Sequence, residues 1–378
     1  MTQQRSYEVI VIGLGAMGSA TLFHLARRGV RVLGLEQFSP GHALGSSHGD
    51  SRIIRETYFE HPLYVPLVHR AHQLWRELEH SSGASLMKIT GGLMIGPEKG
   101  MVVSGTLRSA REHSLPHEVL SAREVHERFP AFRIDGDLVA VLDPRAGYLD
   151  PDACNKAHLD GALAAGAEIR FEDPVVEWSV DGPGVRVQAG SGNFHGARIA
   201  MSAGPWNRRL IHGVDLPLSV ERQTVFWFET PRPTDAYDSA RFPIYAHEFK
   251  PGTICYGFPQ LPRGVKASVM HDGKIMASPD DVDRRIRENE VKPLRQALGP
   301  VLPELAESAI RDSGVCLFTN TPDHDFIIDF HPLHPQVLIS SPCSGHGFKF
   351  ASAIGELQAD LLTHGKSRFD LTPFRIGR

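Results

Sequence analysis

Cysteine is scarce in this sequence: only Cys154, Cys255, Cys316 and Cys343 occur among the 378 residues. They lie far apart, and no two of them form a Cys-x-x-Cys pair. The sequence therefore indicates neither a disulfide framework nor a zinc site. Each thiol has to be interpreted from its own surroundings.

Other features that would assign the protein to a special class are also missing. No apolar run approaches the ~20 residues of a membrane helix. The first residues, MTQQRSYEVIVIG, lead into a strand pattern and not into a signal sequence. The net charge of −4 argues against a nucleic-acid partner. We expect a cytoplasmic protein that binds neither membranes nor nucleic acids and acts on a small molecule.

The length and composition are those of a soluble protein with a large core. The chain of 378 residues is 41% hydrophobic and 22% charged, without an internal repeat or a low-complexity tract. This length exceeds what one hydrophobic core usually organises. We expect two domains, or one core with a large insertion.

A glycine-rich loop stands near the start of the chain. The run YEVIVIG, from Tyr7 to Gly13, is typical of a strand buried on both faces, and GLGAMG adds Gly15 and Gly18 before a helical pattern. A second apolar strand ends at Glu36. Glycines permit a tight turn and close approach to a pyrophosphate, while the acid accepts hydrogen bonds from a ribose. The pattern predicts a dinucleotide site, but FAD and NAD are bound by the same device.

The rest of the chain alternates between two kinds of sequence pattern. Stretches such as TVFWFET and TICYGFP resemble antiparallel strands, whereas the C-terminal QVLISSPCSGHGFKFASAIGELQADLL repeats the strand, glycine turn and helix of the N-terminus. We predict a two-domain α/β (α+β) fold with a Rossmann-like cofactor domain and a discontinuous antiparallel-sheet substrate domain. The expected cofactor-domain segments are 1–87, 146–215 and 315–378, and the expected substrate-domain segments are 88–145 and 216–314.

Two further segments carry helical signals. The apolar stripe of YVPLVHRAHQLWRELE predicts a helix that packs on a core. The stretch ASPDDVDRRIRENEVKPLRQAL begins with Ser278 as an N-cap, Pro279 at the first helical position, and Asp280 and Asp281 in the first turn. It predicts a surface helix inserted in the substrate domain, where no chemistry is expected.

Basic residues gather in the stretch GSSHGDSRIIRETY. His48, Arg52 and Arg55 fall within eight residues, and the arginines would point to one side of a helix. One interpretation is a solvated basic face paired with Asp50 and Glu56. The other is a segment anchored on the core by its isoleucines, with guanidinium groups that capture a carboxylate.

Taken in order, GSSHGDSRIIR, YGFP, GVCLFT, FIID and SGHGFKF resemble the monomeric sarcosine oxidase family. The ending SRFDLTPFR is similar to the N-methyltryptophan oxidase branch, and the resemblance runs from Tyr7 to about Arg375. It implies a monomeric FAD-dependent amine oxidase. Such an enzyme converts the secondary amine of an N-methyl amino acid to an imine, reduces O2 to hydrogen peroxide and releases formaldehyde as the imine hydrolyses.

The resemblance implies a role for one of the four thiols. In this family the cysteine of GVCLFT forms a thioether to the 8α carbon of the flavin, so Cys316 is the expected covalent anchor. For an unassigned cysteine, a small buried apolar side chain is the simpler interpretation. Cys343, in SPCSGHG, is a second thiol expected near the flavin and a rival for the attachment.

The resemblance also assigns the basic residues. It implies that Arg55 and Lys349 hold the substrate carboxylate and that Arg52 and His48 lie against the flavin. Lys349 follows a glycine-rich turn at an expected helix start, where backbone N–H groups also favour an anion.

Three positions near the reaction centre follow from the same resemblance. Lys266 matches the lysine that activates oxygen, where a fixed cation stabilises the anion formed when O2 takes its first electron. Tyr256, in YGFP, matches an active-site tyrosine. The family tyrosine beside the flavin cysteine is replaced by Phe318 here, which affects the substrate pocket.

A second departure concerns the histidine expected four residues after Lys266. That position is Met270, and a histidine follows at His271. If GVKASVMHD is a strand, Lys266 and Met270 share a face with Ser268, and His271 points away. His247 is a candidate for the pocket edge, although a lone histidine is more often structural. A thioether in place of a polar partner favours N-methyl amino acids with a sizeable side chain over sarcosine.

Further cofactor contacts are expected from the glycine loop, the segment after Glu36, and two later turns. They are Ala16, Met17, Gln37, Ser46, Ser51, Val176, Ala203, Gly204, Trp206, Gly345, His346, Gly347 and Phe348.

The sequence leaves other functions open. A related flavin oxidase could act on a fructosyl (Amadori-type) amino acid or on a cyclic imino acid. An FAD-binding tRNA-modification or assembly protein would lack oxidase turnover, and a nicotinamide dehydrogenase would lack the flavin spectrum.

Overall fold

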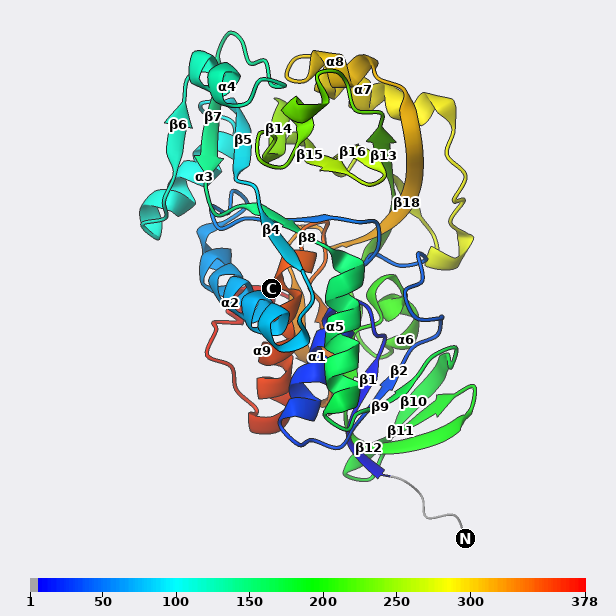
Figure 1. Ribbon diagram of the computed structural model, residues 1–378. Coiled ribbons are helices and arrows are strands. Elements are labelled where there is room, and N and C mark those ends of the chain that lie inside the picture. Colours follow the sequence, from blue (N-terminus) through cyan, green and yellow to red (C-terminus); the bar gives the residue numbers. More distant parts are fainter. Residues whose placement is uncertain (1–5) are drawn as a thin grey trace.

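The first domain is built on an eight-stranded sheet. The computed structural model describes residues 6–378, so the first five residues of the expected cofactor domain lie outside it. Five strands are parallel in the order β9-β2-β1-β12-β20, β19 pairs with β20 in the antiparallel sense, and β10 and β11 extend β12 as a hairpin (Figure 1). The strands are β1 (Ser6–Ile12), β2 (Val32–Leu35), β9 (Glu168–Arg170), β10 (Val175–Asp181), β11 (Gly184–Ala189), β12 (Gly192–Met201), β19 (Ile327–His331) and β20 (His334–Ser341). The predicted Rossmann-like domain is confirmed.

Both faces of β1 are buried, which explains its unbroken apolar run. Val9 and Val11 join a core formed with four helices, whereas Ile10 and Ile12 join a second core with residues of β10 and β11. The helices are α1 (Ala16–Arg27), α2 (Val65–Ser82), α5 (Pro151–Ala164) and α9 (Ala351–His364). A strand covered on both sides cannot alternate polar and apolar residues. The helix predicted from the apolar stripe is confirmed as α2.

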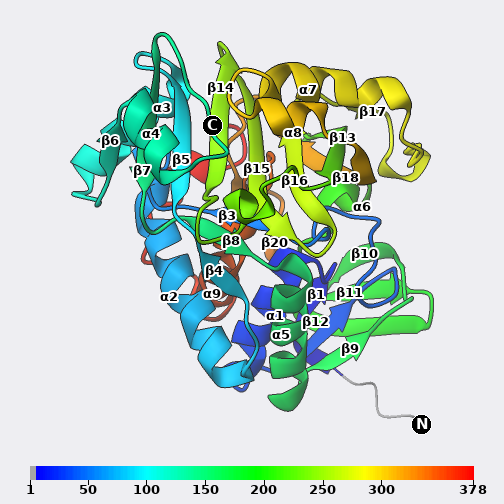
Figure 2. The same ribbon diagram turned by 45° about the horizontal axis from the view of Figure 1, so that its top comes forward.

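The second domain is built on a nine-stranded sheet in the order β17-β13-β16-β15-β14-β5-β7-β6, in which β16 and β17 pair with separate stretches of β13 and β18 pairs with β13 along its length. All neighbours are antiparallel except β14 and β5, which run parallel. The strands are β5 (Gly92–Pro97), β6 (Glu118–Leu120), β7 (Leu138–Asp143), β13 (Ser219–Phe228), β14 (Ile244–Lys250), β15 (Thr253–Leu261), β16 (Gly264–Val269), β17 (Lys274–Met276) and β18 (Ile310–Asn320). Figure 2 shows this sheet above the first domain, with α7 (Lys292–Leu298) and α8 (Pro303–Glu307) on its outer side.

Strand alternation gives the second sheet two different faces. Val265, Ala267 and Val269 of β16 pack outward in the core that contains α7 and α8. Lys266 and Met270 project to the opposite side, toward the first domain. The polar and functional residues of this sheet are therefore displayed on its inner face.

A small antiparallel sheet lies between the two large ones. It pairs β3 (Arg52–Ile54) and β4 (Met87–Ile89) with β8 (Gly147–Leu149). The arginine segment is not helical, because Arg52 starts a strand, so the one-sided arrangement that a helix would give does not apply. This strand nevertheless brings the basic segment to the space between the domains.

The segment after β17 differs from its prediction. Ser278 caps only a 3-10 turn, η4 (Pro279–Asp281), and helical structure resumes at η5 (Glu288–Val291) and α7. Between them, Arg222 donates hydrogen bonds to the carbonyl oxygens of Asp283 (2.5 Å) and Arg285 (2.9 Å). Those carbonyls thus pair with a side chain and not with helical backbone N–H groups, which agrees with the absence of a continuous helix here.

This segment also connects the domains. The Asp280 carboxylate accepts hydrogen bonds from Trp206 Nε1 (2.7 Å) and from Arg209 Nη1 (3.0 Å). Arg284 donates to the carbonyl oxygens of Ala43 (3.1 Å) and Leu44 (2.6 Å). Arg284 of this segment also lines the cavity described below, which the sequence did not predict.

One expected domain boundary requires correction. Residue 315 falls inside β18, which pairs with β13 almost along its whole length, and the chain rejoins the first sheet only at β19. We therefore propose that the last substrate-domain segment ends after Asn320. Among residues 6–378, no helix is long and apolar enough to cross a membrane.

Candidate active site

A cavity of about 1020 Å³ lies between the domains. Its lining comes from the β1–α1 turn, the segment after β2, the inner face of the second sheet and the turn before α9. Small-molecule sites commonly measure roughly 300–1,000 Å³, so this cavity is large enough for a sizeable cofactor together with a substrate.

The glycine loop has the geometry of a phosphate cradle. Gly13 has φ +85°, and a Cβ there would lie 2.7 Å from the Ser202 oxygen. A Cβ at Gly18 would lie 1.8 Å from the Gly13 oxygen. Side chains at either position would displace the strand from the helix, so the turn requires glycine.

Glu36 closes the loop from the end of β2. Its carboxylate is buried and accepts hydrogen bonds from the backbone N–H groups of Leu14 (2.8 Å) and Phe38 (3.1 Å). A carboxylate has about four lone-pair positions, so it can also accept from ribose hydroxyls. Glu36 lines the cavity as predicted.

Several buried polar atoms along the cavity have no partner within the described residues. They are Ser46 Oγ, His48 Nε2, Asn155 Oδ1 and Ser202 Oγ. Buried polar atoms are normally hydrogen-bonded, and the phosphates and hydroxyls of FAD would supply partners. Burial and the neighbouring Arg52 lower the pKa of His48 to about 3, so this imidazole is neutral. The residues present fit FAD.

Most of the predicted cofactor residues line this cavity. They are Gly13, Gly15, Ala16, Met17, Glu36, Gln37, Ser46, His48, Ser51, Arg52, Ala203, Gly204, Trp206, Cys316, Gly345, His346, Gly347, Phe348 and Lys349. Gly18 acts by allowing close packing behind the loop. The assignment of Val176 is wrong: this side chain is 65% exposed on β10, and its neighbour Val175 lines the cavity instead. Successive strand residues point to opposite faces, so an error of one position reverses the assignment.

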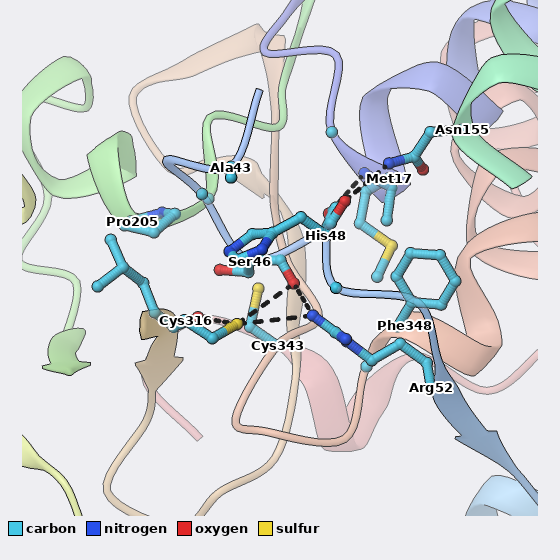
Figure 3. Close-up of a pocket in the computed structure, with 18 of the residues that line it drawn as sticks. Met17, Ala43, Ser46, His48, Arg52, Asn155, Pro205, Cys316, Cys343 and Phe348 are labelled. Atoms are coloured by element: carbon cyan, nitrogen blue, oxygen red, sulfur yellow. Dashed lines mark hydrogen bonds between the residues drawn. The ribbon is translucent and has the colours of Figure 1, made fainter. Parts of the chain in front are cut away.

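Cys316 lies on the inner face of β18, at the centre of a polar cluster (Figure 3). Its Sγ is 3.6 Å from Arg52 Nη2 and 3.7 Å from the carbonyl oxygen of Ser46. A permanent cation therefore lies against this sulfur. Cys343 also lines the cavity, but burial raises the pKa of its thiol to about 11. Because the thiolate is the reactive form, this environment disfavours Cys343 as a nucleophile.

Lys266 is buried on β16 and faces the cavity. Its Nζ donates to the carbonyl oxygens of Gly49 (2.5 Å) and Ser51 (3.0 Å) and lies 5.4 Å from the ring centroid of Trp227. Burial, together with the charge of Arg52, lowers the pKa of Lys266 well below its usual value. The ammonium group is held in place without a carboxylate among its hydrogen-bond partners.

Arg55 is also buried, which makes the solvated-face interpretation wrong. It is 3% exposed, and its guanidinium lies over the rings of Tyr58 (4.2 Å) and Phe59 (3.8 Å). It forms an ion pair with Glu60, whereas Glu56 pairs with Arg145 (3.1 Å).

Lys349 reaches the same end of the cavity from the turn before α9. Its Nζ donates to the carbonyl oxygen of His346 (2.7 Å), and burial with the charge of Arg55 lowers its pKa to about 7. The two residues predicted to bind a carboxylate are thus brought together, although they are far apart in sequence. Glu60, which sequence reasoning missed, lines the cavity with them.

The remaining wall is largely apolar. Tyr256, Met270 and Phe318 line the cavity as predicted, and a Cβ at Gly345 would lie 2.8 Å from Phe318 and 3.0 Å from Met270. Gly345 therefore provides the space into which these two side chains converge.

The predicted face of β16 is confirmed, but the pocket-edge role of His247 is wrong. Lys266 and Met270 line the cavity, whereas His271 turns away and contacts Glu221 (3.2 Å). His247 is buried outside the lining, and its neighbour Ala246 lines the cavity.

Sequence reasoning also missed an apolar row from β15. Ile254 and Phe258 flank Tyr256 at alternate positions and line the cavity with it. The same period-two pattern that predicted the face of β16 could have identified them. No group of three or more His, Cys, Asp or Glu side chains able to bind a metal occurs within residues 6–378.

Comparison with known proteins gives the family. The profile of the family described as DAO, FAD dependent oxidoreductase, matches residues 8–361. Monomeric sarcosine oxidase of Streptomyces avermitilis is 39% identical over 364 residues, covering 95% of this chain and 94% of that protein. N-methyl-L-tryptophan oxidase of Escherichia coli (strain SMS-3-5 / SECEC) is 33% identical over 379 residues, covering 98% and 99%.

Solved structures support the same fold. The open form of NikD, an unusual amino acid oxidase of nikkomycin biosynthesis, has a TM-score of 0.82 at 24% identity and covers 98% of each chain. Glycine oxidase from Geobacillus kaustophilus has a TM-score of 0.83 at 20% identity and covers 99% of each. From the profile match and the near-complete coverage of these relatives, the chain belongs to the DAO family of FAD-dependent oxidoreductases, within the group of amine oxidases that includes monomeric sarcosine oxidase and N-methyl-L-tryptophan oxidase.

Proposed function

We propose that this protein oxidises N-methyl amino acids with O2 as the electron acceptor. The N-methyl amine loses two electrons and two protons to become an imine, and water converts the imine to formaldehyde and a primary amine. O2 takes up two electrons and two protons to become hydrogen peroxide. The observation that carries this proposal is one cavity containing a buried cationic pair, Arg55 and Lys349, and a separate buried cation, Lys266.

FAD, when bound, supplies the two-electron acceptor for this reaction. The glycine loop and Glu36 would hold its dinucleotide portion, and Arg52 and His48 would lie against its ring system. The cation of Arg52 beside the Cys316 sulfur supports Cys316 over Cys343 as a covalent anchor for the flavin.

Arg55 and Lys349 would bind the substrate carboxylate and so position the N-methyl group for reaction. Orientation of this kind supplies a large part of the barrier reduction in many enzymes. The same cationic end disfavours a protonated amine. With the amine bound in its neutral form, no general base among the side chains is required.

Lys266 would act on oxygen. Its ammonium is fixed by the carbonyl oxygens of Gly49 and Ser51, so it needs no reorganisation when negative charge develops nearby. Preorganised charges are the most effective form of electrostatic stabilisation. The position of Lys266 on a different element from Arg55 and Lys349 supports separate sites for oxygen and for the substrate carboxylate.

The apolar wall supports a substrate with a sizeable side chain. Met270, Phe318, Ile254, Phe258 and Ala246 offer few polar partners, and methionine adapts to aromatic groups. We propose a preference for N-methyl derivatives of larger amino acids over sarcosine, and a monomer that acts in the cytoplasm.

A substrate panel tests the proposal. We expect a flavin spectrum and peroxide formation, with N-methylphenylalanine and N-methyltryptophan exceeding sarcosine and N-methylalanine in kcat/KM by about 10–200-fold. Sarcosine leading the panel would refute the pocket argument. A fructosyl amino acid or proline leading would favour a related amine oxidase, and a flavin without peroxide formation would favour the tRNA-modification or assembly alternative.

A further inference from the structure

Tyr58 lies behind the cavity and contacts both cations of the carboxylate site. It is fully buried, and its ring centroid is 4.2 Å from the guanidinium carbon of Arg55. Its Oη is 3.5 Å from Lys349 Nζ, although the two residues are 291 positions apart. Tyr58 does not itself line the cavity, so any effect on the substrate passes through Arg55 and Lys349.

The hydroxyl of Tyr58 has a fixed direction. His346 Nε2 is 2.9 Å from the carbonyl oxygen of His324, and a carbonyl oxygen can only accept, so Nε2 carries a proton. Burial lowers the pKa of His346 to about 4, so the ring is neutral and Nδ1 is an acceptor. Tyr58 Oη, 2.5 Å from Nδ1, therefore donates its proton to His346. The lone pairs of Oη remain available to the Lys349 ammonium.

We propose that Tyr58 is a positioning residue for the carboxylate site: its ring supports the Arg55 guanidinium, and its hydroxyl, oriented by His346, accepts from the Lys349 ammonium. The inference rests on the proposed function, because it assumes that Arg55 and Lys349 bind the substrate carboxylate. No sequence pattern points to Tyr58, since only the fold brings Arg55 to its ring and Lys349 to its hydroxyl.

The charges around Lys349 determine what the hydroxyl can change. Arg55 and Glu60 face it from the segment after β3 with opposite charges, and His346 is neutral within its own turn. Tyr58 is uncharged at working pH, because burial raises its pKa well above the ordinary value. Because Oη donates its own proton to His346, it can act toward Lys349 only as an acceptor, which favours the protonated form of Lys349. Loss of this acceptor should lower the pH at which Lys349 loses its proton.

The test compares wild-type holoenzyme with Tyr58→Phe, which keeps the ring under Arg55 and removes only the hydroxyl. Acetate binding is followed between pH 6 and 9 by the change in the flavin spectrum, with acetamide as the uncharged probe. We expect about three- to tenfold weaker acetate binding at pH 7, a lower midpoint pH and little change for acetamide. An unchanged midpoint would overturn the proposal, because a merely structural defect would weaken binding equally at every pH.

Tyr64→Phe is the matched control. Tyr64 belongs to the same buried aromatic cluster, 5.0 Å from Tyr58, but its hydroxyl donates to Asp325. The Tyr64→Phe variant should leave the midpoint pH unchanged. An equal shift in both variants would contradict a specific positioning role for Tyr58. In a Lys349→Met background, Tyr58→Phe should have no further effect on acetate affinity.

Two other outcomes are decisive. If acetate binding by the wild type is insensitive to Lys349→Met and Arg55→Ala, the carboxylate site and the role of Tyr58 are both refuted. If it is sensitive and only Tyr58→Phe has no effect, the positioning role alone fails. If the Tyr58→Phe variant does not accumulate as holoenzyme, nitrogen-15 NMR of the wild-type histidines tests the proposal instead. A proton on Nε2 of neutral His346 would support the proposal, and a proton on Nδ1 would overturn it.

Discussion

Glu60 forms an ion pair with Arg55 inside the cavity, five residues along the same segment. Burial opposes ionisation of Glu60, but Arg55, together with Lys349, holds the pKa of its carboxyl below the usual value. The guanidinium that is proposed to bind the substrate carboxylate thus already has an anionic partner. A substrate must share Arg55 with Glu60 or displace it.

Removal of this internal anion should strengthen carboxylate binding. We expect Glu60→Gln to bind acetate several-fold more tightly, while breaking a partly buried pair lowers the free energy of unfolding by about 1–3 kcal/mol. Spectral titration and thermal unfolding measure the two effects. Glu56→Gln is the control, since Glu56 pairs with Arg145 and does not line the cavity; tighter acetate binding in that variant would point to a general charge effect.

The affinity for carboxylates should depend on the protonation of Lys349. Its pKa is lowered to about 7 by burial and by Arg55, so the cationic form is present below that pH and is lost above it. Acetate affinity should therefore fall as pH rises through about 7, by at most tenfold per pH unit. Lys349→Met should bind acetate weakly and lose this step. A rise in affinity with pH would contradict the assignment.

Covalent attachment at Cys316 predicts that acid-denatured, washed protein remains yellow. Cys316→Ser should release the flavin on denaturation, because no thioether can form. Cys343→Ser is the control and should keep the colour. A tryptic flavopeptide that contains Cys343 would disprove the assignment.

Replacement of Lys266 should affect the reaction with oxygen more than the reaction with the amine. We expect Lys266→Met to slow flavin reoxidation by about 10²-fold, within the range for loss of a preorganised charge. Stopped-flow traces should show much less change in anaerobic reduction. Lys274→Met, on the surface of β17, should behave as wild type; a defect confined to reduction by the amine would reassign Lys266.

The interdomain contact of Arg284 should help to retain the cofactor. In a Cys316→Ser background, we expect Arg284→Ala to weaken FAD binding about tenfold, because two charge-assisted bonds to residues 43–44 are lost, and Ala43 lines the cavity. Quenching of FAD fluorescence gives the dissociation constant. Arg285→Ala is the control, since this exposed side chain pairs with Asp283, and equal weakening in both variants would exclude a specific role.

The sequence by itself determined the features that depend on neighbouring residues. The unbroken apolar run of β1, the glycine turn after it and the acid at Glu36 predicted the cofactor loop, because backbone conformation and strand burial are encoded locally. Strand alternation likewise predicted that Lys266 and Met270 face the cavity and that His271 does not, although β16 ends at Val269 and the last two residues lie in the turn after it.

Only the tertiary structure decided which partner each charged or polar group takes. Glu60 rather than Glu56 pairs with Arg55, and Tyr58 meets Lys349 from 291 positions away. In the segment after Ser278, whose sequence predicts a helix, Arg222 donates hydrogen bonds to two backbone carbonyl oxygens. On the edge strand β10 the prediction was off by one residue, because Val176 is exposed and Val175 lines the cavity. These outcomes depend on distances between elements remote in sequence, which local propensity and periodicity do not contain.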